Sequence, residues 1–185
     1  FYSVKNGQNR KVNLGVDDSF VKGYVNYAQL LLKGNTRPVW TGATVLKKNL
    51  FNDVGGFVPL LKFGEDFDLF FKVYLKSGLA LMNKELAFYS QDADPKFRAI
   101  TKKYYPKEET VFFNLNYPEQ FENDEVKLLV EFLKLRSLYP YFLKGMYKKE
   151  VKEAIKDIDF KKHNRKYYWQ YKVLPIWLQN LWHFS

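Results

Sequence analysis

The sequence predicts an α/β domain followed by an α-helical extension. In residues 1–115, short β-prone apolar segments alternate with segments of helical period, the pattern of a mixed sheet with flanking helices. From residue 116 on, the apolar residues recur with the helical period only. Lys and Arg outnumber Asp and Glu by thirteen to five between Lys127 and Lys172. We therefore expect a domain at 1–115 and a basic, aromatic helical extension at 116–185.

Composition limits the classes of protein that this chain can belong to. The 185 residues are 46% apolar and 19% aromatic, which is enough to build a sizeable core. The absence of cysteine excludes disulfides and thiolate sites. His163 and His183 both lie near the C-terminus, so a histidine-based metal site or triad in the main body is excluded. The net charge of +10 favours a polyanionic partner, and no apolar run is long enough to predict a transmembrane helix.

The first 46 residues predict a hairpin, a helix and a buried strand. Residues 1–4 and 11–14 predict two strands, joined by a polar turn over residues 5–10 that contains Asn6-Gly7. Residues 20–33 predict a helix that Asp17-Asp18-Ser19 caps, and we interpret the aspartate pair as a cap in preference to a metal site. Residues 37–46 predict a loop entering a buried strand.

A short helix is predicted over residues 47–54. The following Gly55 and Gly56 suit a left-handed C-terminal cap, and Phe57 is expected to return to the core. Further along the chain, residues 79–82 and 86–89 predict short buried strands.

The chain is organised around an acidic helix start at Glu65, Asp66 and Asp68. A helix is predicted over residues 65–77, and its apolar face is formed by Phe67, Phe70, Phe71, Tyr74 and Leu75. Carboxylates stabilise a first helical turn through its free N–H groups and dipole. Paired carboxylates at the edge of a core are also a common source of a general base. Both interpretations stay open at this point.

The neighbouring motifs resemble one known family. In chain order they are Trp40-Thr41-Gly42-Ala43-Thr44-Val45-Leu46-Lys47-Lys48, Leu50-Phe51, Val54-Gly55-Gly56-Phe57 and Gly64-Glu65-Asp66-Phe67-Asp68-Leu69. This ordered set, over about residues 36–100, resembles the acceptor half of inverting glycosyltransferases of family 2, which have the GT-A fold. The resemblance implies a partial GT-A-like, Rossmann-related mixed sheet and transfer of a sugar from a nucleotide-sugar donor to a saccharide or lipid-linked acceptor.

The resemblance implies a role for each matching carboxylate. Asp66 corresponds to the general base that deprotonates the acceptor hydroxyl, and Glu65 to the residue that supports it. Asp68 corresponds to a residue that orients acceptor or donor, although it is equally well explained as a carboxylate of the helical turn.

Four further residues correspond to substrate contacts. Trp40, Thr41 and Gly42 match the stretch that lines the sugar and acceptor pocket, with a core position as the alternative for Trp40. Arg98 is a candidate phosphate contact in a polar loop where Asp92 and Asp94 predict a turn.

The donor side of the family is not recognisable in this chain. The resemblance implies a divalent metal, Mn²⁺ or Mg²⁺, held by an Asp-x-Asp motif after a strand, and residues 1–35 contain no such motif. We predict no metal ligand in this chain. We expect it to be the C-terminal part of a longer bacterial enzyme of polysaccharide biosynthesis, inactive by itself.

The extension predicts two helices and a basic, aromatic end. Helices are expected at 125–136 and 141–158, separated at Pro140. Residues 161–184 combine a basic run with Tyr and Trp, which is typical of an interfacial segment on an anionic membrane. Packing of the aromatic residues onto the core or a second subunit explains the segment at least as well, and nucleic acid is the least favoured partner.

These patterns leave three hypotheses for function. The first is a glycosyltransferase in the cytoplasm, peripheral at the inner face of the membrane. The second is a non-catalytic basic module that binds anionic membrane or nucleic acid. The third is a degenerate partner subunit that keeps the fold without activity.

Overall fold

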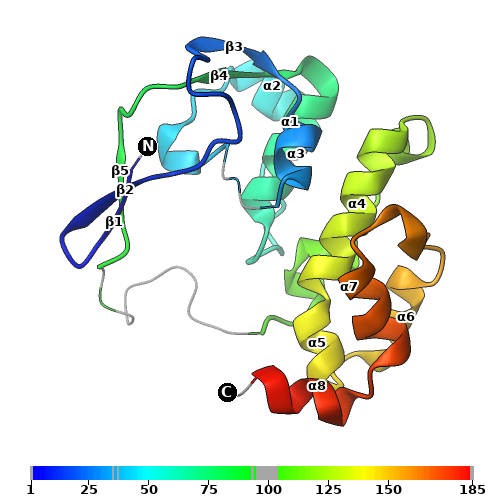
Figure 1. Cartoon of the computed structure of the whole chain (residues 1–185). Coiled ribbons are helices and arrows are strands. Elements are labelled where there is room, and N and C mark those ends of the chain that lie inside the picture. Colours follow the sequence, from blue (N-terminus) through cyan, green and yellow to red (C-terminus); the bar gives the residue numbers. More distant parts are fainter. Residues whose placement is uncertain (1, 35, 37, 93, 95–103, 184–185) are drawn as a thin grey trace. The chain divides into compact units, whose positions relative to one another are not determined.

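The computed structural model describes residues 2–34, 36, 38–92, 94 and 104–183. The structure is mixed α/β and divides into two compact units, Phe1–Tyr105 and Pro106–Ser185. The sequence predicted this boundary at residue 115. The N-terminal unit contains all the described strands, and the C-terminal unit is helical, with short 3₁₀ turns before and between its helices (Figure 1).

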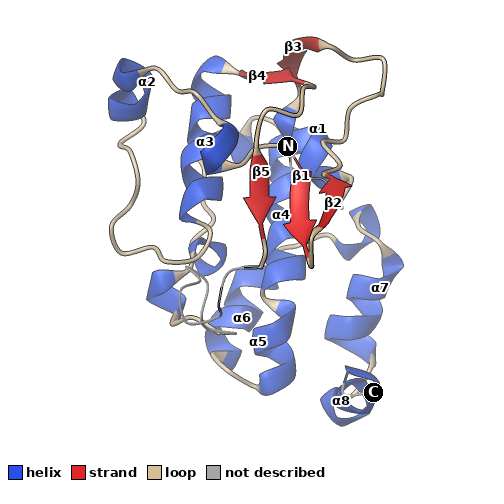
Figure 2. Cartoon of the chain, turned by 90° about the vertical axis from the view of Figure 1, so that its left-hand side faces the viewer, coloured by secondary structure: helices blue, strands red, loops and turns tan. Residues whose placement is uncertain are grey.

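A three-stranded sheet carries the predicted N-terminal hairpin. The strands β1 (Tyr2–Lys5) and β2 (Gln8–Lys11) are antiparallel, and β5 (Phe88–Ser90) pairs parallel to β1 on its other side (Figure 2). Asn6 and Gly7 form the turn with φ of 50° and 70°. Positive φ at both positions is what a two-residue turn of type I′ requires, so Asn-Gly is favoured here. The predicted hairpin is confirmed, but its second strand, expected at residues 11–14, forms at Gln8–Lys11.

A second sheet replaces half of a predicted helix. Residues 22–25 form β3 (Lys22–Val25), which pairs antiparallel with β4 (Leu79–Met82), and only α1 (Tyr27–Leu32) is helical. The prediction of a helix over 20–33 was therefore wrong in its first half. Pairing with β4, a segment more than fifty residues away, decides the conformation of residues 22–25. The spacing of apolar residues within 20–33 does not indicate such a partner.

The predicted cap at Asp17-Asp18 was also wrong. Asn26 is the N-cap of α1, and its side chain accepts a hydrogen bond from the Gln29 amide. The Asp17 carboxylate instead accepts hydrogen bonds from the amide and hydroxyl of Ser19, at 2.9 and 2.5 Å. These bonds close a local turn and lower the pKa of Asp17.

The segment before α2 departs from the predicted buried strand. Thr41–Ala43 is a 3₁₀ turn and Val45 is fully exposed, so no strand forms there. The helix α2 (Lys48–Asp53) forms as predicted, and Gly55 and Gly56 follow it with φ of 83° and 61°. A Cβ on Gly56 would lie 2.9 Å from the Phe51 ring, so glycine is required there for space as well as for φ.

Two predictions of burial in the N-terminal unit were wrong. Phe57 contacts the Phe51 ring edge-on but is 42% exposed, so it does not return to the core. The predicted strands form as β4 and β5, but their side chains alternate between half-buried and exposed. A strand at the edge of a small sheet has one face in solvent, and a run of apolar residues does not indicate that some of its side chains are exposed.

The helix α3 (Glu65–Ser77) confirms the predicted acidic helix. Gly64 precedes it in the left-handed conformation, and Gly78 ends it, with φ of 82° and 74°. Its buried apolar side chains are Leu69, Phe70, Phe71 and Val73. Of the predicted face, Phe70 and Phe71 are buried, and Phe67, Tyr74 and Leu75 are half-buried. The Phe71 ring contacts Tyr27 of α1, so α1 and α3 pack together.

The C-terminal unit is built on α4 (Asp124–Ser137). Asn123 caps this helix by accepting hydrogen bonds from the amides of Glu125 and Val126. Its inward side chains Val126, Leu129, Val130, Leu133 and Leu135 are all buried. The remaining helical segments are α5 (Tyr139–Lys144), α6 (Lys148–Ile155), α7 (Arg165–Tyr168), a π-helical turn (Trp169–Val173) and α8 (Ile176–His183).

The second predicted helix of the extension is interrupted. Pro140 lies in the first turn of α5, as its missing N–H allows. The chain then turns at Gly145 and Tyr147, with φ of 65° and 49°, before α6 begins. A continuous helix over 141–158 was therefore a wrong prediction. Glycine past the end of α5 is an ordinary helix stop that the continuous apolar period concealed.

A buried polar pair connects α4 with the segment that precedes α7. The side chains of His163 and Glu131 are 3% and 10% exposed, and His163 Nε2 lies 2.9 Å from Glu131 Oε2. Lys134 on the same helix is partly buried, and burial lowers its pKa while the carboxylates of Glu131 and Asp157 oppose that shift.

Candidate functional site

The first turn of α3 presents Asp66 to solvent. Gly64 turns the chain into the helix, and the Gly64 carbonyl accepts the hydrogen bond of the Asp68 amide at 3.0 Å. The Asp66 carboxylate accepts a hydrogen bond from the Phe67 amide at 2.7 Å and forms no ion pair with a described Lys or Arg. An exposed carboxylate at this position is accessible to a hydroxyl of a bound molecule.

The three carboxylates of this turn have different environments. Asp68 is 5% exposed and accepts a hydrogen bond from Lys72 Nζ at 2.6 Å, one helical turn further on. Glu65 is half-buried, and Asp66 is exposed. Successive helical positions diverge by about 100°, so Glu65 and Asp66 do not face each other. The structure therefore favours the helix-turn interpretation for Asp68.

The negative charge of Asp66 affects the pKa of Tyr27. Burial raises the pKa of the Tyr27 hydroxyl far above its usual range, and the negative charge of Asp66 adds to the rise. Tyr27 therefore stays protonated at any physiological pH, beside the acidic end of α3.

The other predicted group, Trp40, Thr41 and Gly42, forms a compact turn. The half-buried Trp40 ring meets Tyr89 edge-on, with centroids 5.2 Å apart. Its carbonyl accepts hydrogen bonds from the Ala43 amide and the Thr44 hydroxyl. A Cβ on Gly42 would lie 2.6 Å from the Trp40 ring, which folds back over the glycine. Thr41 and Gly42 themselves are exposed.

The structure thus keeps the predicted residues in two local groups, one on the first turn of α3 and one at Trp40. Arg98 lies outside the described residues. Within the part of the chain that the structure describes, no three His, Asp or Glu side chains gather closely enough to hold a metal ion. The Asp17 carboxylate already bonds to Ser19. These residues do not fit the divalent metal that the resemblance implies.

Asp92 has a structural role that the sequence did not reveal. Its carboxylate accepts a hydrogen bond from the Asn6 amide at 2.7 Å, and its own amide donates to Ser90 Oγ at 3.3 Å. Asp92 therefore joins two segments 86 residues apart, and the predicted turn at Asp92 and Asp94 includes residue 93, which lies outside the described residues. Only the fold brings these segments together.

Replacing Asp92 by alanine is expected to weaken the β1–β2 hairpin by about 1 kcal/mol, the usual net value of such a hydrogen bond. Hydrogen exchange of the amides of residues 2–11 measures this as faster exchange. Asp92→Asn keeps an acceptor and serves as the control. Equal exchange in the wild type and the alanine variant would contradict the assigned role.

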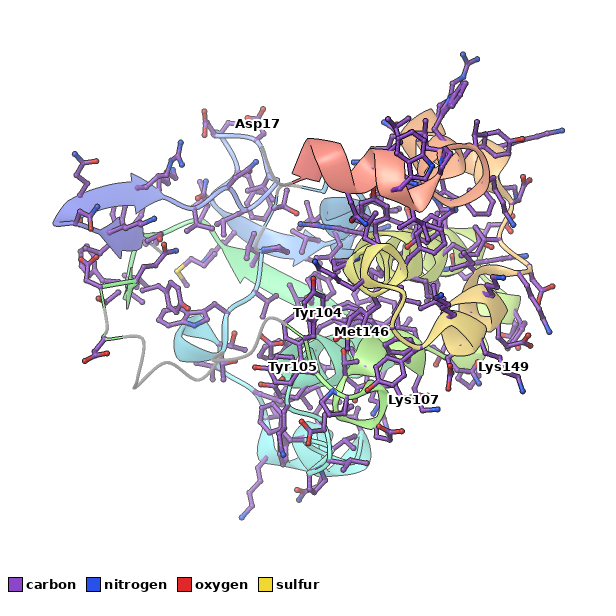
Figure 3. The ribbon with its side chains drawn as sticks, turned by 90° about the horizontal axis from the view of Figure 1, so that it is seen from below. Asp17, Tyr104, Tyr105, Lys107, Met146 and Lys149 are labelled. Atoms are coloured by element: carbon purple, nitrogen blue, oxygen red, sulfur yellow. The ribbon has the colours of Figure 1, made fainter. Side chains whose placement is uncertain are left out.

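The C-terminal unit contains a pocket of about 490 Å³. It is lined by Lys107, Glu108, Phe113, Asn114, Lys149, Glu150, Glu153 and Ala154. Lys107 Nζ lies 2.6 Å from Glu150 Oε1, and this contact raises the pKa of Lys107 and lowers that of Glu150. Lys107 and Lys149 are labelled in Figure 3. No sequence signal marks this pocket, because its walls come from segments about forty residues apart.

The basic, aromatic end of the chain is partly buried and partly exposed. Tyr167 and Tyr171 point inward, and the Tyr171 hydroxyl donates a hydrogen bond to the Leu135 carbonyl at 2.8 Å. Tyr168, Trp169 and Trp177 are exposed. Every described helix is too short or too polar to cross a lipid bilayer. The segment thus packs through one face onto its own unit and leaves the other face in solvent.

Comparisons of the chain with protein-family models, with curated proteins and with solved structures found no match. The assignment to a family therefore stays a prediction from the ordered motifs between Trp40 and Leu69, and function must be argued from the site.

Proposed function

We propose that this chain forms the acceptor side of an inverting glycosyltransferase of the GT-A type, with Asp66 as the general base. The observation that carries the proposal is the environment of Asp66. Its carboxylate is exposed at the start of α3 and has no ion pair with a described cation, whereas Asp68 in the same turn is buried and paired with Lys72. Of the three acidic residues, Asp66 is the exposed one, which makes it the proposed base.

The chemistry requires one proton transfer to this chain. As an acceptor hydroxyl attacks the anomeric carbon of the nucleotide-sugar, its proton passes to the Asp66 carboxylate, and the nucleoside diphosphate departs from the opposite face. Because the hydroxyl attacks the face opposite the leaving group, the anomeric configuration is inverted. A positioned base contributes about 10²–10⁴-fold to such a rate. In the family, a divalent metal on the diphosphate assists departure of the leaving group, and the described residues provide no site for it.

The neighbouring residues support this role in different ways. The Asp68–Lys72 ion pair and Gly64 hold the first turn of α3, which fixes the position of Asp66. Half-buried Glu65 lies beside Asp66 in the sequence and is proposed to position the acceptor. The Trp40 turn offers an aromatic ring and, at Gly42, an exposed backbone, the combination that suits contact with a sugar ring. A lipid-linked saccharide at the inner face of the membrane is the acceptor class that the resemblance favours.

Replacing Asp66 by asparagine is expected to lower the rate of sugar transfer by about 10²–10⁴-fold. Asparagine keeps the size of the side chain but cannot accept the proton at neutral pH. The assay uses the intact protein that contains residues 1–185, a panel of nucleotide-sugars, and the release of nucleoside diphosphate in the presence of acceptor.

The matched control is Asp53→Asn. Asp53 is also an exposed helical carboxylate of the N-terminal unit, 3.8 Å from Lys76, and it belongs to no proposed site. It should transfer sugar at the wild-type rate, and circular dichroism should show both variants folded. Transfer by Asp66→Asn at the wild-type rate would refute the assignment of the base. Absence of transfer by the wild type with every donor would favour a non-catalytic role.

A further inference from the structure

The C-terminal unit exposes a group of large apolar side chains that we call the aromatic ridge. It consists of Tyr168, Trp169, Val173, Leu174 and Trp177, which are 49%, 52%, 44%, 36% and 68% exposed. These five residues lie within residues 168–177, which run from the end of α7 through the π-helical turn to the start of α8. Such concentrated exposure of Trp, Tyr, Val and Leu indicates an interaction surface.

Two buried tyrosines determine which side of this segment faces outward. Tyr167 and Tyr171 are four positions apart and are 4% and 8% exposed. The Tyr171 hydroxyl bonds to the Leu135 carbonyl, and the Tyr167 ring packs edge-on against Phe132 of α4. Tyr168 and Trp169 therefore lie away from α4. Their exposure follows from the way in which the segment is anchored.

A π-helical turn and a glutamine hold the ridge in one arrangement. The Leu174 amide bonds to the Trp169 carbonyl five residues before it, at 2.8 Å, and this wide turn places both Val173 and Leu174 one turn beyond Trp169. Buried Gln179 donates hydrogen bonds to the carbonyls of Gln170 and Leu174, at 2.8 and 2.7 Å, and accepts one from Tyr139. These bonds tie the start of α8 to the turn.

The ridge lies within a strictly cationic segment. Residues 160–185 contain five basic residues and no acidic ones: Lys161, Lys162, Arg165, Lys166 and Lys172. All five are exposed, and none forms an ion pair with a described carboxylate. Lys172 Nζ lies 5.3 Å from the centroid of the Phe160 ring. The positive charge is local, because the C-terminal unit as a whole has fourteen basic and eleven acidic residues.

We propose that the aromatic ridge docks the protein onto an anionic lipid bilayer. Trp and Tyr rings favour the boundary between headgroups and acyl chains, and lysines beside them are attracted to lipid phosphates. Val173 and Leu174 offer aliphatic surface that the acyl boundary can bury. The ridge belongs to the C-terminal unit, whereas Asp66 belongs to the N-terminal unit. The inference therefore holds whether or not the chain takes part in sugar transfer.

Two other partners fit the ridge less well. A single-stranded nucleic acid would stack on the Trp and Tyr rings and bind the lysines, but it would leave Val173 and Leu174 without a role. A second copy of the chain would form a symmetric contact in which the same cations approach one another. An anionic bilayer is the partner that matches the aromatic, aliphatic and cationic components together.

The test measures partition of the whole chain onto vesicles of phosphatidylglycerol and phosphatidylcholine at low salt, with phosphatidylcholine vesicles for comparison. Cosedimentation and the blue shift of tryptophan emission report binding. The double substitution Trp169→Ser/Trp177→Ser should weaken partition by about tenfold or more, because it removes both interfacial indoles. High salt should weaken partition of the wild type by screening the lysines.

The matched control is Phe121→Ser. Phe121 belongs to the same unit and is 81% exposed, but it lies outside the ridge and should not affect binding. A second variant, Trp169→Phe/Trp177→Phe, should retain most of the partition. All the replaced side chains are exposed, so circular dichroism should show each variant folded.

Four results would overturn the proposal. Two concern vesicles: absence of partition onto anionic vesicles, and equal partition by the serine double variant and the wild type. The other two concern different partners: binding to single-stranded oligouridine that is tighter than binding to vesicles, or a dimer in sedimentation, in each case lost in the serine double variant. Asp66→Asn should bind vesicles like the wild type, so a failure of the proposed catalysis and a failure of docking are distinguishable.

Discussion

Replacing Phe71 by alanine is expected to lower the free energy of unfolding of the N-terminal unit by about 3–5 kcal/mol. Phe71 is fully buried in the middle of α3. Its ring centroid lies 5.3 Å from that of Phe67, 6.0 Å from Tyr74 and 6.5 Å from Tyr27. Alanine removes these ring contacts and leaves a cavity at the junction of α1 and α3, which these rings cannot readily collapse to fill.

Hydrogen exchange with mass spectrometry is the suitable measurement, because it assigns the loss of protection to α1 and α3. Lys76→Ala on the exposed side of α3 is the control and should change the free energy by at most about 0.5 kcal/mol. Unchanged protection of α3 in the Phe71 variant would contradict the packing described above. The result also bears on function, because α3 positions Asp66.

Replacing His163 by leucine is expected to destabilise the C-terminal unit by about 3 kcal/mol, because the buried Glu131 carboxylate loses its partner. The two side chains are 3% and 10% exposed and their polar atoms are 2.9 Å apart. Solvent therefore cannot replace the missing hydrogen bond effectively. The loss should also loosen the attachment of the segment that leads into α7.

The double variant Glu131→Leu/His163→Leu should recover most of this stability, since it removes the unpaired charge and retains apolar volume. Urea unfolding followed by tryptophan emission gives the free energies of the wild type, Glu131→Leu, His163→Leu and the double variant, the four values needed for a double-mutant cycle. Trp40→Phe as a common background restricts the signal to the three tryptophans of the C-terminal unit. A double variant destabilised by the sum of the two single effects would show that the pair contributes nothing specific.

Local patterns predicted the elements whose formation depends on neighbouring residues. The bounds of α3 follow from Gly64, the apolar period and Gly78, and the hairpin turn follows from Asn6-Gly7. The double glycine after α2 is another local signal. Each of these depends on backbone conformations or spacings within about one helical turn, which adjacent residue types control directly.

Predictions failed where a distant segment competed with the local pattern. Residues 22–25 have an acceptable helical period, yet they pair with β4 as a strand. Asp92 bonds to the turn at Asn6 across 86 residues, and His163 meets Glu131 across 32. No local rule identifies such partners. Burial of Phe57 and of the β4 and β5 side chains was overestimated because an apolar residue type does not show what covers the side chain.

For the candidate site, the sequence by itself determined that Glu65, Asp66 and Asp68 share the first turn of a packed helix, because capping glycines and apolar spacing act locally. Only the tertiary structure distinguished them, by burying Asp68 against Lys72 and leaving Asp66 in solvent. Likewise, the sequence determined that residues 161–184 are basic and aromatic, and packing on α4 decided which rings are exposed. Burial depends on what covers a side chain, and the covering residues come from elsewhere in the chain.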